Sequence, residues 1–456
     1  MLPPLSNGYD RQWNKSQNTI QHNLVGNLFC LGSGGLFTVF LSAYFGRLPI
    51  LNLFTALALA TSAWCAAATS FESYMAARIL NGFFSIVAQA GGLMYIQDIF
   101  FFHEHPRKIN IWSGAIIVSP YLGPLIAAFI VDKMPWPNAF WVNTGLTALC
   151  WLLIVGGMEE TIYNRRIPEG QRVAPQPGIK GRVSRLLGIE QWRTRGQRQT
   201  FVQALMRPVV AISKVPVLLC TIYYFLNFAW IIGVNATISI WLTEFYKFTP
   251  YNLGTSSSSP LRAFSPLFSL ASSTTDSIPP VIIGMFYFAP IIGSILGTAL
   301  GQFIHDYLGS LYTRRHAGRI EPEARLLIIY LASPLMAASI LILGYALQNT
   351  WHHILIAVFA SGQVMGIMIA TVGLNAYLLD AYPEGSGEVG AWIVVGRTLG
   401  GFMATYVEIN WVQKDGLVKV FGAQTGITAA AGLIILALGW WGKRLRIAQG
   451  HMKFAM

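Results

Sequence analysis

The stretch Val215–Thr243 reads VPVLLCTIYYFLNFAWIIGVNATISIWLT and contains no Asp, Glu, Lys or Arg. About 20 apolar residues in a helix are enough to cross the hydrocarbon core of a bilayer, which is about 30 Å thick. Five more stretches lack these four residue types: Leu48–Phe71, Ile109–Val131, Met134–Met158, Ser277–His305 and Val420–Gly442. A soluble core has no room for six such helices, so the sequence predicts an all-α polytopic membrane protein.

The composition supports this fold class. Of the 456 residues, 54% are hydrophobic and 11% are charged, whereas an ordinary soluble domain has about 25% charged residues. The first nineteen residues are polar, so we expect the internal helices to direct insertion rather than a cleavable signal. The four cysteines lie in separate apolar stretches, which favours small apolar side chains over disulfides or a metal site: Cys30, Cys65, Cys150 and Cys220.

The charged and polar breaks divide the chain into eleven expected spans. They are 20–42, 50–70, 76–97, 110–131, 138–158, 215–243, 280–304, 326–346, 354–378, 389–410 and 422–441. After a polar segment at 1–19, the first five form an N-terminal bundle at 20–160, and the last six form a C-terminal bundle at 215–442. A basic linker at 161–214 joins the bundles and a basic tail follows at 443–456. The Ser-, Thr- and Pro-rich residues 255–280 are expected to form a loop.

The distribution of positive charge predicts the orientation. When the spans alternate, 22 Lys and Arg fall on the side of the linker and five on the other side. Positive charge gathers on the cytoplasmic side, so we expect the linker and the C-terminus in the cytoplasm and the N-terminus outside. The formal net charge of +12 is then explained by loops beside anionic lipid, rather than by nucleic-acid binding.

Two short segments indicate an internal repeat. Ala43-Tyr44-Phe45-Gly46-Arg47 and Asp306-Tyr307-Leu308-Gly309-Ser310 share the pattern x-Tyr-x-Gly, each at a predicted turn between two membrane helices. Glycine permits the tight backbone of such a turn. Duplicated bundles are common among secondary transporters. In the second half, Gly293, Gly297 and Gly301 lie on one helix face, which predicts close packing against a neighbouring helix.

Several motifs resemble those of the major facilitator transporters. Leu41–Pro49 (LSAYFGRLP) resembles the family loop L-[SA]-D-R-x-G-R-[RK]-P, and Arg78–Gly82 (RILNG) resembles the fourth-helix element R-x-x-[QN]-G. Ser119–Ala128 (SPYLGPLIAA) is similar to the fifth-helix motif of antiporters, and Trp136–Trp141 and Glu160–Tyr163 match the W-x-x-A-F-W and E-T-x-Y patterns. From about Gln21 onward, the chain resembles a fungal drug:proton antiporter-type facilitator.

This resemblance implies a carrier of a small organic solute, with protons as a possible second partner, in the form of a monomer. The family has twelve helices, so the resemblance implies a further helix before Ile20; either the N-terminus is missing from this sequence or the protein lacks that helix. Ala43 replaces the acid of the family loop, although Asp306 retains it in the second half, and 255–280 resembles an insertion. An incomplete gene model would explain the first and third departures together.

The resemblance assigns a gating network to Gly46, Arg47 and Asp98, with Arg107, Asp306 and Gly309; solvated loop charges are the alternative. Two arginines are predicted inside the membrane, Arg78 and Arg397, where they either have a functional or pairing role or extend to the interface. Gly123 and Pro124 lie in the middle of a predicted helix. Proline frees a carbonyl and bends a helix, so these residues predict either a kink or close packing.

Polar and aromatic side chains within the spans are candidates for the solute cavity. They are Gln89, Tyr95, Tyr223, Tyr224, Asn227, Asn235, Asn375 and Tyr377. Each could instead form a hydrogen bond between helices. We expect no metal and no cofactor. Asp98, Asp132, Glu244, Asp380, Glu388 and Glu408 are all expected near span ends, so proton antiport rests on the resemblance alone.

These observations favour proton-coupled efflux of a small organic solute, at the plasma membrane rather than the vacuole. Uptake of a nutrient on the same fold is one alternative, and a non-transporting sensor or truncated, inactive product is another. The sequence contains no P-loop, nucleophile elbow or H-E-x-x-H motif, which argues against an enzyme or an ATP-driven pump.

Overall fold

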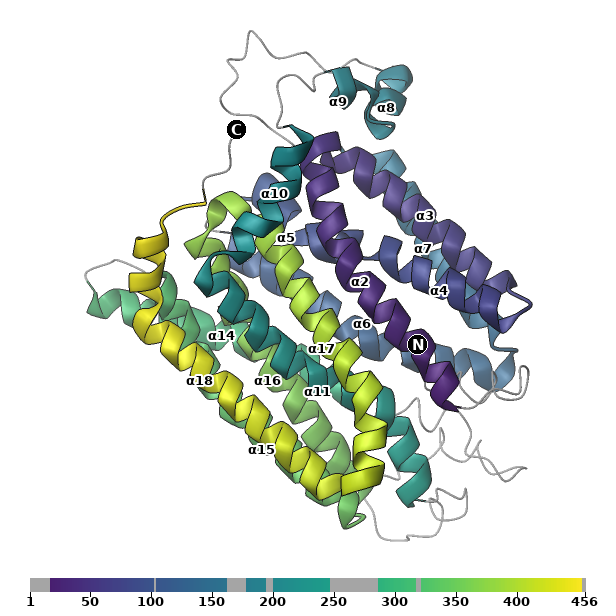
Figure 1. Ribbon diagram of the computed structural model, residues 1–456, viewed down its shortest axis with the longest axis vertical. Coiled ribbons are helices and arrows are strands. Elements are labelled where there is room, and N and C mark those ends of the chain that lie inside the picture. Colours follow the sequence, from purple (N-terminus) through teal and green to yellow (C-terminus); the bar gives the residue numbers. More distant parts are fainter. Residues whose placement is uncertain are drawn as a thin grey trace.

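The computed structural model describes residues 17–101, 104–161, 178–193, 200–246, 286–316 and 321–452, and every regular element in these ranges is a helix (Figure 1). Ten helical segments are long and apolar enough to cross a membrane. The predicted all-α polytopic membrane class is therefore confirmed. The expected loop at 255–280, segment 1–16 and parts of the linker and tail lie outside the described residues.

The first half contains six helices in chain order: α2 (Gln17–Phe45), α3 (Arg47–Ala67), α4 (Phe71–Ser85), α5 (Val87–Ile99), α6 (His105–Lys133) and α7 (Pro137–Gly157). The span expected at 76–97 is built from α4 and α5 in series, with a turn at Ile86. Gly46 separates α2 from α3 with a φ of 107°, a conformation that favours glycine. The predicted turn at Gly46 is confirmed.

The second half contains α11 (Val215–Tyr246), α14 (Phe288–Arg315), α15 (Ile329–Gln348), α16 (His353–Ala381), α17 (Ser386–Asp415) and α18 (Leu417–Gln449), with short 3₁₀ turns η6 (Pro322–Ile328) and η7 (Pro383–Gly385). Helix α17 is not among the ten apolar segments because it carries Glu388, Arg397, Glu408 and Lys414. It nevertheless lies between α11 and α2 and packs against both (Figure 1). The division into five and six spans stays a prediction.

One predicted turn is wrong. Asp306 and Gly309 do not join two helices, because α14 continues without a break to Arg315. The Thr313 hydroxyl donates to the Gly309 carbonyl at 2.7 Å, and Asp306 is exposed. A solvent-exposed carboxylate does not interrupt a helix, so Asp306 marks only the point where the apolar part of α14 ends.

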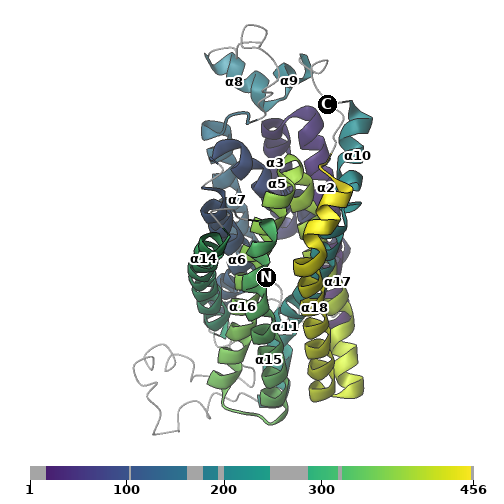
Figure 2. The same cartoon turned by 90° about the vertical axis from the view of Figure 1, so that its left-hand side faces the viewer.

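The described part of the linker is helical and lies at one end of the molecule, here called the linker end (Figures 1 and 2). It consists of α8 (Gly178–Leu186), α9 (Ile189–Arg193) and α10 (Phe201–Ile212). Thr200 and Gln203 form a capping box that starts α10. Arg182 donates to the Ile154 and Val155 carbonyls in the last turn of α7, which attaches α8 to the first bundle. The turn between α17 and α18 lies at the opposite end, the far end.

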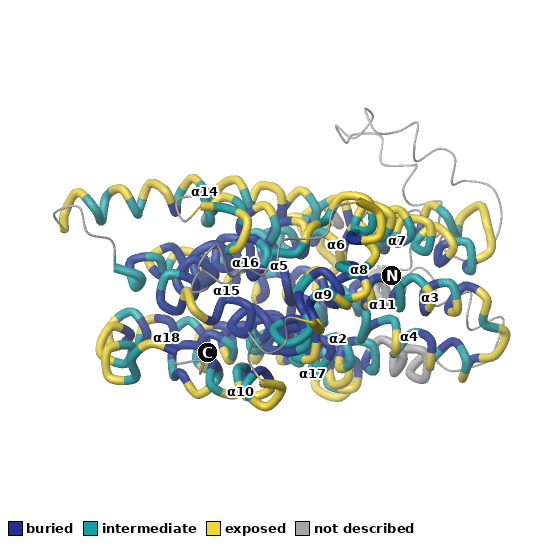
Figure 3. The backbone as a smooth tube through the Cα atoms, turned by 90° about the horizontal axis from the view of Figure 1, so that it is seen from above, coloured by how far each residue is buried: buried dark blue, intermediate teal, exposed yellow. Residues whose placement is uncertain are grey.

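Large apolar side chains cover much of the outer surface. Helix α7 exposes Leu146, Leu149, Leu152 and Leu153, and α14 exposes Ile295 and Phe303. Figure 3 shows exposed residues along the outer face of α14 and buried ones gathered around α15 and α16. Water would penalise such a surface, whereas the hydrocarbon of a bilayer does not.

Candidate functional site

Helix α6 carries the main polar contacts between the two halves. It contains Pro120 and Pro124 within an unbroken helix. Because Pro124 has no N–H, the Pro120 carbonyl lacks its helical partner; Asn235 on α11 donates to that carbonyl from Nδ2, at 3.4 Å. Pro120 likewise frees the Ile116 carbonyl, which accepts from the Ser119 hydroxyl at 2.8 Å. The prolines thus leave a free carbonyl on α6 that accepts a hydrogen bond from a side chain of the other half.

A second contact is a short chain of hydrogen bonds through Asn375 on α16. The Tyr224 hydroxyl on α11 donates to Asn375 Oδ1 at 3.2 Å, and Asn375 Nδ2 donates to the Ser113 hydroxyl on α6 at 2.9 Å. All three side chains are buried. The chain connects two helices of the second half to α6.

A third contact is closer to the start of α6, where Asn110 Nδ2 donates to the Thr298 carbonyl of α14 at 3.2 Å. Asn110 is 5% exposed. Helix α6 therefore contacts α11, α16 and α14, each through one polar side chain.

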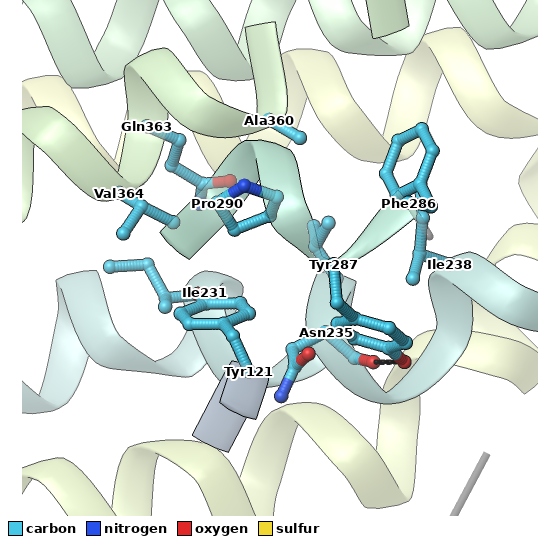
Figure 4. Close-up of a pocket in the computed structure, with 11 residues that line it drawn as sticks. Tyr121, Ile231, Asn235, Ile238, Phe286, Tyr287, Pro290, Ala360, Gln363 and Val364 are labelled. Carbon is cyan, nitrogen blue, oxygen red and sulfur yellow. Dashed lines mark hydrogen bonds between the residues drawn. The ribbon is translucent and has the colours of Figure 1, made fainter. Parts of the chain in front are cut away.

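A pocket lies between α6, α11, α14 and α16, at the Asn235 contact (Figure 4). Its free volume is about 20 Å³, enough for roughly one water molecule. The Tyr287 hydroxyl closes one side by donating to the Asn235 carbonyl at 3.3 Å. The lining is mostly apolar and aromatic: Tyr121, Ile231, Val234, Asn235, Ile238, Phe286, Tyr287, Pro290, Ala360, Gln363 and Val364.

Within the described residues, one atom of each of two side-chain amides in this pocket lacks a hydrogen-bond partner. Asn235 Oδ1 is a buried acceptor without a donor, and Gln363 Nε2 is a buried donor without an acceptor. An unpaired buried polar group costs about 1–3 kcal/mol. The pocket thus combines an apolar wall with polar atoms able to orient a small molecule.

The other cavity candidates lie elsewhere. Tyr223, Asn227 and Tyr377 are buried within the second half, where Asn227 Nδ2 donates to the Tyr223 carbonyl at 2.9 Å. Gln89 on α5 is half-buried and does not line the pocket. Tyr95 lines a second pocket, of about 510 Å³, between α3, α5 and α6, and its hydroxyl donates to the Arg47 carbonyl at 3.4 Å. Of the eight candidates, Asn235 lines the pocket, and Tyr224 and Asn375 belong to the neighbouring contact.

The two arginines predicted inside the membrane contact aromatic rings of adjacent helices. The Arg397 guanidinium on α17 lies 4.4 Å from the Phe228 ring centre on α11 and is 8% exposed. Arg78 on α4 lies 5.4 Å from the Phe140 ring centre on α7. Within the described residues neither forms an ion pair, so cation–π attraction is their observed interaction.

The predicted gating residues meet only in part. Arg47 and Asp98 form an ion pair at the linker end. Glu160, which sequence reasoning assigned only to a motif, accepts from the backbone N–H of Arg47 and Leu48 at 3.1 and 3.3 Å. A carboxylate at this position stabilises the start of α3. Arg107 and Asp306 are exposed on other helices and do not join the pair.

Further contacts at the linker end were not predicted. Gln97 Nε2 on α5 donates to the Pro383 carbonyl of η7 at 2.8 Å, which joins the two halves. Arg207 on α10 pairs with Glu388 on α17, and Arg325 pairs with Asp380 at 3.1 Å. Since these partners are far apart in sequence and most have ordinary surface-residue types, no motif identified them.

The two helical halves and the apolar outer surface are typical of a multi-pass membrane protein. The sequence profile of the Major Facilitator Superfamily matches residues 1–405. The chain belongs to this family and is an integral membrane protein.

Curated relatives are fungal transporters of low identity. An uncharacterized transporter of Schizosaccharomyces pombe is 22% identical over 96% of this chain and 83% of its own length. The MFS-type transporter oryF of Aspergillus oryzae is 23% identical over 91% of this chain and 79% of its own. The efflux pump radE of Floropilus chiversii is 22% identical over 93% of this chain and 72% of its own.

Solved structures share the fold. The proton:xylose symporter XylE superposes with a TM-score of 0.59 at 15% identity, covering 96% of this chain and 90% of that one. The human organic anion transporter MFSD10 gives 0.57 at 16% identity, covering 91% and 83%. At these identities the similarity concerns the fold alone.

Proposed function

We propose that this protein exports a small organic solute by alternating access, coupled to proton entry, and that the pocket around Asn235 and Gln363 is its solute site. The observation that carries the proposal is the pair of buried, unpartnered amide atoms within an aromatic and apolar wall. Once motion of the halves enlarges the pocket, a partly apolar molecule with one donor and one acceptor would satisfy both atoms. The aromatic rings of Tyr121, Phe286 and Tyr287 suit a flat solute.

The location of the pocket suits alternating access. Tyr121 belongs to the first half, and the remaining lining residues belong to the second, so relative motion of the halves opens or closes the site. The closing contacts from Asn235 and Asn375 are single hydrogen bonds. Such bonds between membrane helices contribute about 0.6 kcal/mol on average, which permits their exchange during a cycle.

The direction of transport and the driving ion rest on similarity. The relative radE is named an efflux pump, and Ser119–Ala128 is similar to the antiporter motif. We place the linker end in the cytoplasm, on the charge distribution, and the protein in the plasma membrane. The transported class is then a small organic compound that leaves the cell while protons enter.

Dye efflux from yeast cells that lack their own dye exporters tests the proposal. Rhodamine 6G serves as the flat, partly apolar probe, and we expect cells with the protein to lose it faster, in a manner abolished by a protonophore. Asn235→Ala and Gln363→Ala should slow efflux, whereas Gln89→Ala, a half-buried amide outside the pocket, should not. Faster dye accumulation would indicate uptake instead, and equal effects of the three variants would exclude this pocket as the site.

A further inference from the structure

One face of α17 carries a carboxylate that neither the sequence motifs nor the pocket uses. Arg397, Gly401, Ala404 and Glu408 follow one another along the face that packs against α11, as the neighbours of Gly233 and Gly401 show. Glu408 is completely buried. It lies seven residues before the end of α17 at Asp415, about 10 Å along the helix. The sequence placed Glu408 only near a span end and did not predict that it is buried.

The surroundings of Glu408 contain one polar partner. Gln424 on α18 donates from Nε2 to Glu408 Oε1 at 3.4 Å. Glu408 Oε2 faces Gly233 of α11, and among the described residues neither this oxygen nor Gln424 Oε1 has a hydrogen-bond partner. Both atoms are acceptors, so the arrangement is short of one donor.

No charged group compensates this carboxylate in the described structure. The described side chains of α11 and α2 include no Asp, Glu, Lys, Arg or His, and Tyr224, the nearest tyrosine of α11 in sequence, is nine residues from Gly233, about 13 Å along the helix. Lys414 and Asp415 on α17 and Lys419 on α18 are exposed at the far-end turn. Arg397 shares the face of Glu408 but lies eleven residues away, about 16 Å along the helix.

One proton on Glu408 Oε2 supplies the missing hydrogen-bond donor. It also neutralises the carboxylate, whose charge is costly to bury without a partner. The resulting O–H can donate to Gln424 Oε1, so that acid and amide form two reciprocal hydrogen bonds. Both unpartnered atoms are then satisfied.

We propose that Glu408 is the proton-binding group of the transport cycle, held as the carboxylic acid against Gln424 in the closed conformation. Protonation takes one proton from water, and ionisation returns it to water and leaves a carboxylate that must be hydrated. This assignment rests on the proposed proton-coupled transport.

Helix α11 connects this group to the pocket. Its Gly233 contacts Glu408, while Ile231, Val234 and Asn235 of the same turn line the pocket. Hydration of an ionised Glu408 requires α11 or α18 to move away from α17, and movement of α11 displaces one wall of the pocket. The proton and the solute therefore act on opposite faces of one helix.

Infrared spectroscopy of the purified full chain in lipid tests the proton directly. At pH 7 we expect a carbonyl stretching band of a protonated carboxylic acid that is lost in Glu408→Gln. Glu72→Gln, which alters an exposed carboxylate at the start of α4, is the matched control and should leave the band unchanged. A spectrum at pH 7 that Glu408→Gln leaves unaltered would overturn the proposal, because Glu408 would then be ionised in this state.

Vesicles containing the same variants test the role in transport, with rhodamine 6G as the probe. We expect Glu408→Gln to retain exchange of the dye across the membrane and to lose accumulation driven by a pH gradient, with Glu72→Gln like the wild type. Accumulation by Glu408→Gln equal to wild type, or driven by a sodium gradient, would overturn the assignment. Absence of any dye movement in wild type, with the infrared band present, would refute the proposed function and leave the proton site itself supported.

Discussion

Asn235 on α11 donates its side-chain N–H to the Pro120 carbonyl on α6, across the interface between the two halves. That carbonyl is available only because Pro124, one helical turn later, has no N–H to offer it. The antiporter-like motif therefore has a physical consequence in this chain. It creates an acceptor beside the pocket, and the residue that uses this acceptor also lines the pocket.

The relationship predicts that the effects of substitutions at Asn235 and Pro124 are coupled. Asn235→Ala should destabilise the protein by about 0.6 kcal/mol, the typical value of a hydrogen bond between membrane helices. In a Pro124→Ala background the new N–H at 124 can bond to the Pro120 carbonyl, so Asn235→Ala should cost less. A double-mutant cycle on thermal denaturation in detergent measures the difference. Additive effects of the two substitutions would show that the hydrogen bond from Asn235 to this carbonyl does not stabilise the protein.

The Tyr224–Asn375–Ser113 chain predicts a graded loss of stability. Asn375→Ala removes both hydrogen bonds and leaves two buried hydroxyls without this partner, whereas Ser113→Ala removes one. We expect losses of about 1–3 kcal/mol for Asn375→Ala and about 1 kcal/mol or less for Ser113→Ala. Thermal denaturation of the purified variants, with Gln89→Ala as the control, provides the comparison. The reverse order would mean that Asn375 is not the centre of the chain.

The sequence predicts the fold well where the signal is local. Apolar runs between charged and polar breaks predict the ten apolar segments, and the glycine at position 46 predicts the turn that the structure shows with a positive φ. The stripe of Gly293, Gly297 and Gly301 predicts close packing, and these residues do lie against the backbone of α16 at Ser361, Met365 and Ile369. Such features depend on neighbours one or two turns away. The turn at Asp306–Gly309 fails because glycine followed by exposed polar residues fits a helix as well as a turn.

The candidate site was less predictable because it depends on which helix faces meet. Asn235 was one of eight equivalent polar residues, and only the packing of α6 against α11 places it in the pocket while Tyr377 faces α18. Gln363 was not singled out, since an isolated amide in an apolar helix has no motif. The burial of Glu408 was not predicted, because a position near a span end says nothing about the helices that pack around it. Arg207 and Glu388 are 181 residues apart in the sequence, so only the three-dimensional structure shows that they pair.

The Arg207–Glu388 pair predicts an asymmetry between its two partners. The Glu388 side chain is 3% exposed and that of Arg207 is 20% exposed. Arg207→Ala leaves a buried carboxylate without this partner and should cost about 3–5 kcal/mol. Glu388→Gln leaves an arginine that can reach water and should cost about 1 kcal/mol. Thermal denaturation in detergent compares the two variants. Equal losses would indicate that Glu388 is hydrated in the native state.

Glu160 predicts a stabilising role at the start of α3. Glu160→Gln removes the negative charge beside the free N–H groups of Arg47 and Leu48 while keeping the size of the side chain. We expect a loss of about 1 kcal/mol in stability, and faster hydrogen exchange of the first turn of α3. Glu159→Gln is the matched control, because the Glu159 carboxylate pairs with Arg182 on α8 instead. Unchanged exchange at α3 in Glu160→Gln would rule out the capping interaction.

Close packing of α17 against α11 leads to the last prediction. A methyl group added at Gly396 would lie 2.6 Å from the Thr221 carbonyl oxygen of α11, and a backbone atom cannot move aside as a flexible side chain can. Gly396→Ala must therefore separate the two helices, which disturbs the Arg397–Phe228 contact one residue later. Overpacking of this kind costs about 1–3 kcal/mol.

Gly426 on α18 is the matched control, because a methyl group there meets no atom within 4 Å. Gly426→Ala should leave stability unchanged or raise it, since alanine favours the helix by up to about 1 kcal/mol. The midpoint temperature of thermal denaturation in detergent and the rate of dye efflux should both fall for Gly396→Ala. Neither should fall for Gly426→Ala. Because α11 also forms a wall of the pocket, a Gly396→Ala protein that is destabilised yet exports dye at the wild-type rate would separate the α11–α17 packing from transport. This result would contradict the proposal that displacement of α11 couples protonation of Glu408 to the solute site.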